Sequence, residues 1–173
     1  STVITASAQT SATETTMSVA NVGGFSGSYG DGQGEILSLK KITDTGFSTE
    51  YVYVESASRD EPTSDTDFSG KLYVVRGYSG STPADSSSLG DAASVATTYE
   101  NGQVIVSTGR VNTGYIRLNA NPNDDATPYI DIVERTGSAI YDVDLKTRLG
   151  DLSGLSSGRL HGTDPATAGF GLY

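Results

Sequence analysis

The chain has 173 residues, enough for one ordinary domain or two small ones. Its 11 basic and 21 acidic residues give a formal net charge of -10, which argues against nucleic acid as a partner because a phosphate backbone needs a basic face. The absence of cysteine excludes disulfides and thiolate metal sites, and no apolar run reaches the roughly 18 residues that span a bilayer.

Strand-like runs dominate the first part of the chain, and no segment has a convincing helical pattern. Abundant Gly, Ser, Thr and Tyr are typical of an all-β protein. The runs cover residues 2–4, 15–19, 35–42, 50–57, 71–76, 94–99 and 103–107. Asn101-Gly102 tolerates the positive φ angles of a tight turn, so the sequence predicts a hairpin between the last two runs. We expect residues 1–107 to form a small β-sandwich or barrel.

Three segments of this part resemble a small β module that is common in bacteriophage tail and baseplate proteins. They are the strand head Gly34-Glu35-Ile36-Leu37, the strand 51–54, and the strand end Arg76-Gly77-Tyr78-Ser79-Gly80-Ser81-Thr82 before a small-residue loop. The chain differs from the module in having Gly-Ser-Thr for Gly-Thr and no histidine in that loop. The resemblance implies an attachment domain that binds other tail or baseplate proteins.

Residues 108–113 are polar and glycine-interrupted, which is typical of a linker. Beyond them we expect a strand at 114–119 and a hairpin of strands 128–134 and 139–145 around Thr136-Gly137. The predicted organisation is therefore an oligomerisation region at 114–150 and an extended strap at 151–173 that leads toward a fibre shaft.

Both faces of the predicted hairpin carry apolar side chains. Ile130 and Ile132 point one way, and Tyr129 and Val133 the other, because side chains alternate along a strand. A lone hairpin cannot bury two faces, so we expect another copy of the chain to cover one. The predicted oligomer interface consists of Tyr129, Ile130, Ile132, Val133, Ile140, Tyr141, Val143, Leu145 and Leu149.

The end of the chain, from Arg148-Leu149-Gly150-Asp151-Leu152 to Gly169-Phe170-Gly171-Leu172-Tyr173, resembles the region before the shaft in bacteriophage tail-fibre and tail-tip proteins. The resemblance implies a non-enzymatic virion subunit that attaches the fibre to the tail, starts its trimer and supports host adsorption. It implies a homotrimer, a location in the virion tail, no cofactor and no membrane insertion. Two alternatives stay open: a sugar- or cell-wall-degrading tail enzyme, and a secreted bacterial or archaeal surface filament subunit.

Three patterns that carry chemistry in other proteins have simpler interpretations here. His161, the only histidine, lies in a polar loop, where a Ser-His-Asp triad would lack orienting groups. The glycine-rich run 30–34 precedes a strand rather than a helix, so a turn is favoured over a phosphate loop. Residues 121–125 lack the spacing of a calcium loop, so a solvated turn is favoured, and any calcium there would be a structural staple.

Two further pairs of charged residues have open interpretations. Asp142 and Asp144 fall on one face of the predicted return strand, as a glycosidase pair would, but the chain lacks tryptophan for a sugar platform. A solvated strand edge is the simpler interpretation. Arg76 and Arg148 each follow an apolar strand and either close a strand end through local contacts or pair with another subunit. We expect no catalytic residue and no metal ligand.

Overall fold

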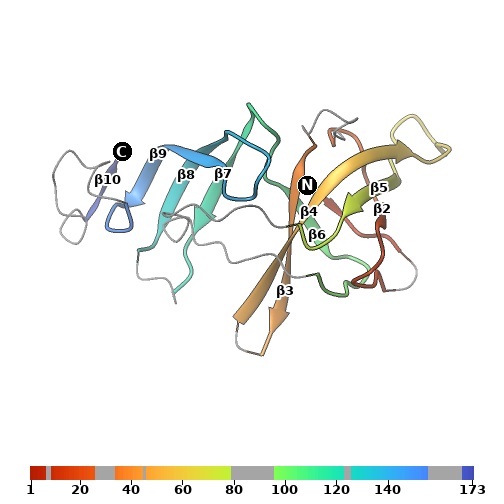
Figure 1. Ribbon diagram of the computed structural model, residues 1–173, viewed down its shortest axis with the longest axis horizontal. Helices are drawn as coiled ribbons and strands as arrows, with labels where there is room; N and C mark the ends of the chain where they lie inside the picture. Colours follow the sequence, from red (N-terminus) through yellow and green to blue (C-terminus); the bar gives the residue numbers. More distant parts are fainter. Residues whose placement is uncertain (7–8, 26–33, 45, 79–95, 123–125, 156–168) are drawn as a thin grey trace.

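A computed structural model describes the chain except for residues 7–8, 26–33, 45, 79–95, 123–125 and 156–168. The described residues form ten β-strands in two antiparallel sheets and no helix, which confirms the all-β prediction. The two sheets lie side by side along the long axis of the molecule (Figure 1). Nothing in this described part is a helix long and apolar enough to cross a membrane.

The first sheet is a nearly closed barrel. Its strands are β1 (Thr2–Val3), β2 (Thr16–Val19), β3 (Ile36–Thr43), β4 (Gly46–Arg59), β5 (Gly70–Val75) and β6 (Val104–Ser107), in the spatial order β1-β6-β3-β4-β5-β2. A bridge between Ile4 and Val19 brings the two ends of the sheet together. Alternate residues point inward, as Leu72 and Val74 do in β5, and form one buried core. Of the two predicted architectures, the structure shows the barrel.

The predicted hairpin around Asn101-Gly102 is wrong in its pairing. Gly102 does adopt a positive φ of 88° in a turn, but residues 96–98 form no strand, and residues 94–95 lie outside the described part. Tyr99 bridges Thr10, and its buried ring belongs to the barrel core. β6 instead pairs with β1 and β3. Burial of an aromatic ring thus decides the path of the chain before the turn.

The second sheet contains β7 (Gly114–Asn119), β8 (Tyr129–Arg135), β9 (Val143–Asp151) and β10 (Phe170–Leu172), in the spatial order β10-β9-β8-β7. The predicted return strand, 139–145, is wrong in its bounds, because β9 begins later and runs past Arg148. Gly150 adopts a φ of 131°, and a Cβ there would lie 2.4 Å from the Pro128 carbonyl oxygen. Glycine therefore lets β9 continue where β8 approaches it closely.

Buried contacts join the two sheets. Ile36 and Tyr51 of the barrel pack against Ile140 and Tyr141 of the loop between β8 and β9. The Tyr78 hydroxyl donates to the Ser138 carbonyl oxygen at 2.6 Å. Thr108, the first residue of the predicted linker, is buried and takes part as well. The buried guanidinium of Arg135 donates to the Thr108 carbonyl oxygen at 3.1 Å and to its hydroxyl at 2.9 Å. The location of the domain boundary stays a prediction.

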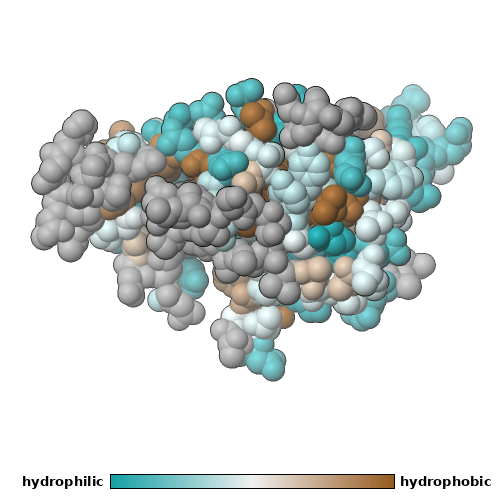
Figure 2. Space-filling model, viewed as in Figure 1, coloured by the Kyte–Doolittle hydropathy of each residue, from teal (hydrophilic) through white to brown (hydrophobic). Residues whose placement is uncertain are grey.

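The surface of the barrel is mostly hydrophilic where loops cover it. In Figure 2 hydrophilic residues gather at the right-hand end, around the loop between β4 and β5, while hydrophobic residues form separate small patches. Asp67 organises this loop by accepting from the backbone and hydroxyl of Thr63 and of Ser69. These hydrogen bonds hold the pKa of Asp67 well below its usual value, and the bond from the Thr63 backbone has the largest effect.

Candidate interaction surface

The inner face of the second sheet carries a row of charged residues that crosses three strands. Arg117, Asp131 and Arg148 are direct cross-strand partners on β7, β8 and β9. The carboxylate of Asp131 accepts from Arg148 Nε at 2.7 Å and Nη2 at 2.9 Å, and from Arg117 Nη2 at 3.0 Å. Asp131 and Arg148 are both fully buried. Two guanidinium groups therefore share one carboxylate inside the protein.

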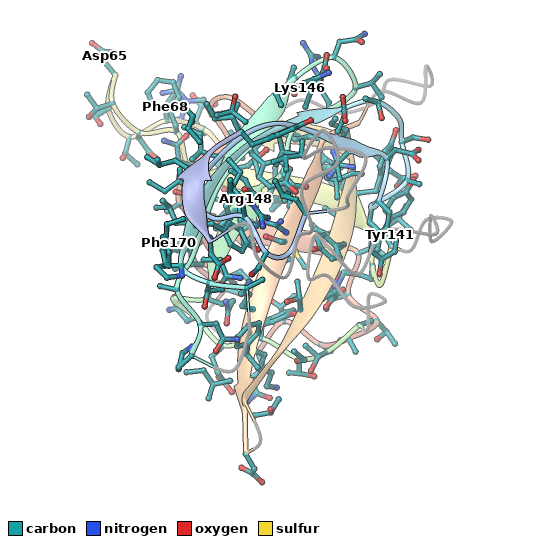
Figure 3. All side chains as sticks on the ribbon, turned by 90° about the vertical axis from the view of Figure 1, so that its left-hand side faces the viewer. Asp65, Phe68, Tyr141, Lys146, Arg148 and Phe170 are labelled. Carbon is teal, nitrogen blue, oxygen red and sulfur yellow. The ribbon has the colours of Figure 1, made fainter. Side chains whose placement is uncertain are left out.

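Aromatic and aliphatic groups enclose this row. The Arg148 guanidinium lies 3.7 Å from the centroid of the Tyr129 ring. Burial acts to lower the pKa of Arg117, but Tyr129 and the hydrogen bond to Asp131 outweigh it, so the pKa is raised. Leu152 and Leu155, which follow β9, pack with β8 and β9 residues over the same face. The chain itself therefore covers the inner face, and Figure 3 shows Arg148 inside the molecule.

The opposite face of the same sheet is largely apolar and exposed. Leu118, Ile130, Leu149 and Leu172 are successive cross-strand partners, so one apolar row crosses all four strands. We define the outer apolar face as the side chains of Ile116, Leu118, Ile130, Ile132, Leu149, Phe170 and Leu172, which are between 40% and 74% exposed. Phe170 lies at the outer edge of the molecule in Figure 3.

The area of the outer apolar face matches that of one side of a protein interface. Each of the seven side chains exposes on the order of 100 Å², so together they expose on the order of 700 Å² of apolar surface. Monomeric proteins rarely expose contiguous apolar patches of more than a few hundred Å². A stable interface buries about 800 Å² per partner. The outer apolar face therefore has the size that one partner contributes.

Two hollows lie along this face. The first has a volume of about 430 Å³, and its lining includes Leu118, Ile130, Leu149 and Phe170. The second is a groove of about 510 Å³ between the barrel and β7, which we call the β6–β7 groove. Its lining residues are Ser38, Lys40, Tyr51, Gln103, Val104, Val106, Ser107, Thr108, Tyr115, Ile116, Arg117 and Leu118. The apolar surface thus extends from the second sheet toward the exposed valines of β6.

The structure divides the predicted interface residues between three environments. Ile130, Ile132 and Leu149 lie on the outer apolar face. The others are covered by the chain itself: Tyr129, Val133 and Leu145 are buried and Val143 half-buried on the inner face, and Ile140 and Tyr141 are buried between the two sheets. Whether any of them contacts another copy stays a prediction.

Four residues of the outer apolar face are absent from the interface predicted from the sequence. Ile116 and Leu118 show the two-residue spacing of an exposed strand face, which was a usable signal. Phe170 and Leu172 have the same spacing in β10. Their strand is only three residues long, so its pattern is too short to distinguish from an extended strap.

The charged candidates make contacts within the chain. Asp142 lies before β9 and accepts from the Ala139 backbone at 2.9 Å, so it is not on one strand face with Asp144. Asp144 and Glu134 accept from Lys146 and raise its pKa above the usual value. Arg76 follows β5 and pairs with Glu50, as expected for an arginine that closes a strand end. Arg148 instead lies within β9 and pairs with Asp131 of β8.

The other sequence candidates fall mostly beyond the described residues. His161, residues 30–33 and residues 123–125 lie outside them. In the part that the structure describes, no group of three or more His, Asp or Glu side chains is placed to hold a metal ion.

Comparison with known proteins found no similarity to this chain. No protein-family model matches it, and neither a search of curated proteins nor a search of solved structures returned a significant match. The chemistry of the outer apolar face is therefore the basis for assigning a function.

Proposed function

We propose that this chain is a non-enzymatic structural subunit of a bacteriophage tail fibre or tail tip, whose copies associate as a homotrimer through the outer apolar face. The observation that carries the proposal is that the second sheet buries its charged face and exposes its apolar face, the reverse of the usual arrangement. The row Arg117–Asp131–Arg148 is covered, whereas the row Leu118–Ile130–Leu149–Leu172 is exposed. An exposed apolar patch of this size marks a surface that another molecule covers.

The distribution of charge supports self-association through the second sheet rather than the barrel. Residues 1–109 carry 5 basic and 13 acidic groups, a net charge of -8, whereas residues 110–173 carry 6 and 8, a net charge of -2. Bringing the second sheets of several copies together therefore involves less electrostatic repulsion.

The barrel supplies a separate attachment unit in this proposal. It has a closed apolar core of its own, which leaves its loops free for contacts with other tail or baseplate proteins. The resemblance of residues 34–82 to a tail and baseplate module supports this role, and that of residues 148–173 to pre-shaft segments supports a position next to a fibre. The subunit would act in the virion tail during host adsorption, without a cofactor.

Changing Ile132 to aspartate should shift the trimer toward monomer. The substitution places an unpaired carboxylate within the covered face, and burying it would carry a large desolvation cost. The measurement is sedimentation equilibrium of the chain at tens of micromolar, where the unchanged protein should be a trimer.

The matched control for this experiment is Ile42→Asp. Ile42 is 88% exposed at the end of the β3–β4 hairpin, outside the outer apolar face, and its substitution changes the net charge equally. Ile42→Asp should leave the trimer intact. A monomeric unchanged protein, or an equal effect of both substitutions, would refute association through this face.

The proposed role also predicts that the protein has no hydrolytic activity. Asp142 and Asp144 are engaged by the Ala139 backbone and by Lys146, rather than facing each other across a substrate cleft. Incubation with host polysaccharide or cell wall should release no reducing ends and cause no loss of turbidity. Turnover that disappears in Asp142→Asn or His161→Ala would establish the tail-enzyme alternative instead.

A further inference from the structure

Both end strands of the second sheet have an open edge. The order β10-β9-β8-β7 leaves one side of β7 and one side of β10 without a paired strand in the described part of the chain. β7 is six residues long and contains neither proline nor lysine, two of the devices that proteins use to block edge pairing. Its edge is thus a template for another strand.

The backbone hydrogen bonds show which β7 residues face the open side. The Arg135 N–H donates to the Thr113 carbonyl oxygen at 2.7 Å, so Thr113 directs its carbonyl toward β8. Residues along an antiparallel strand alternate between its two neighbours. The backbone N–H and carbonyl groups of Tyr115 and Arg117 therefore also point toward β8. Those of Gly114, Ile116 and Leu118 point toward the open side.

The residues of β10 alternate in the same way between the side paired with β9 and the open side. Tyr173 exchanges hydrogen bonds with Arg148 of β9, at 2.8 and 3.2 Å, and the Leu152 N–H donates to Gly169 at 2.9 Å. The backbone N–H and carbonyl groups of Gly169, Gly171 and Tyr173 therefore point toward β9. Phe170 and Leu172 direct their backbone groups to the open side.

We propose that the open edge of β7 in one copy pairs with the open edge of β10 in a second copy, which rests on the self-association of the proposed function. β10 runs antiparallel to β7, because three antiparallel pairings separate them. Opposite residues in an antiparallel pair lie on the same face. The outward residues on both edges belong to the outer apolar face, so this pairing joins the faces of two copies into one.

The β6–β7 groove is the space that the incoming strand would occupy. Val104 and Val106 of β6 are about half exposed there, opposite Ile116 and Leu118 of β7. Phe170 and Leu172 of the second copy would cover these four side chains. The groove lining contains Lys40 and Arg117 but no carboxylate, so a strand from an acidic chain meets no like charge there.

The pairing is head to tail, since β7 of one copy meets β10 of the next. Such an interface uses two different surfaces of each copy and gives a closed ring when its rotation closes. Three copies closing in this way would form the proposed trimer with its apolar faces turned toward one another. Closure also removes every open edge of the second sheet.

Proline substitution tests the pairing because proline lacks the N–H that an edge residue donates. Ile116→Pro and Leu172→Pro each remove an outward N–H that the protein's own sheet does not use. Each variant should be monomeric by sedimentation velocity at concentrations where the unchanged chain assembles. Ile116→Val and Leu172→Val keep the N–H and an apolar side chain, and should still assemble. Leu118→Pro removes another outward N–H of β7 and replaces Ile116→Pro if that variant fails to fold.

Mixing the two proline variants tests the head-to-tail geometry. One variant keeps an intact β10 and the other an intact β7, so the mixture should form dimers of one copy of each and nothing larger. Assembly of Leu172→Pro alone, with Ile116→Pro monomeric, would show that β7 pairs with itself and would overturn the proposal. If both proline variants assemble normally and only Ile132→Asp does not, strand pairing is wrong and the proposed function stands. A monomeric unchanged chain refutes both.

Discussion

Replacing Glu50 with alanine should lower the free energy of unfolding by about 3–5 kcal/mol. Glu50 is buried in β4, and its carboxylate accepts from Arg76 Nε at 2.7 Å and Nη2 at 3.0 Å. It also accepts the backbone N–H groups of Gly77 at 2.9 Å and Thr97 at 3.0 Å. Alanine would leave a buried guanidinium without its counter-charge and two N–H groups without acceptors. Urea unfolding followed by circular dichroism measures the loss.

The control for this substitution is Glu55→Ala on the same strand. Glu55 is exposed, so its removal should change the free energy of unfolding by less than about 0.5 kcal/mol. Glu50→Gln keeps the volume of the side chain but presents an N–H₂ group to the Arg76 donors, and should also be destabilising. A loss below about 1 kcal/mol in Glu50→Ala would mean that water or the carbonyl groups around Arg76 compensate the charge.

The position of most strands could be predicted because their apolar residues alternate. β5 follows the pattern closely, with Gly70, Leu72 and Val74 buried and the residues between them exposed. β7 has the predicted bounds, 114–119, since glycine and asparagine mark its ends. Alternation depends only on neighbouring residues, so the sequence displays it directly.

The pairing of strands could not be predicted in the same way. Asn101-Gly102 makes a turn, but β6 pairs with β1 and β3, which are distant in the sequence. The partners of Arg76 and Arg148 could not be predicted either: Arg76 is 26 residues from Glu50 in the sequence, and Arg148 is 17 residues from Asp131. Both pairs depend on strand register, and a slip of one residue would turn every side chain to the other face.

The sequence indicated a two-sided hairpin but not how each face is covered. Ile130 and Ile132 on one face, and Tyr129 and Val133 on the other, are equally apolar in the sequence. Only the structure shows that residues after β9 pack with Val133, that the Arg148 guanidinium lies over the Tyr129 ring, and that the first pair is exposed. The short run at residues 152–155 that provides this cover contains only two large apolar residues, too few to signal a core contact.

Replacing Asp131 with alanine should also lower the free energy of unfolding by about 3–5 kcal/mol. Asp131 lies on the central strand β8 and binds Arg117 on one side and Arg148 on the other. Its removal would leave two guanidinium groups close together in the interior, where they repel each other and lack an acceptor. Arg117 Nε already has no hydrogen-bond partner, so the arginine depends on Asp131 for its charge pairing. Denaturant unfolding of the second sheet, followed by near-ultraviolet circular dichroism of Tyr129 and its neighbours, reports the loss.

Two comparisons separate charge from packing as the cause. Asp144→Ala removes a partly exposed carboxylate from the same sheet, whose ion pair with Lys146 should contribute less than about 1 kcal/mol. The triple substitution Arg117→Met, Asp131→Leu and Arg148→Met replaces the whole row by apolar side chains, and such replacements are often neutral or stabilising. It should therefore recover most of the stability that Asp131→Ala loses. If the triple variant is no more stable than Asp131→Ala, removal of uncompensated charge does not restore stability, and the packing of Arg148 on the Tyr129 ring contributes to stability in its own right.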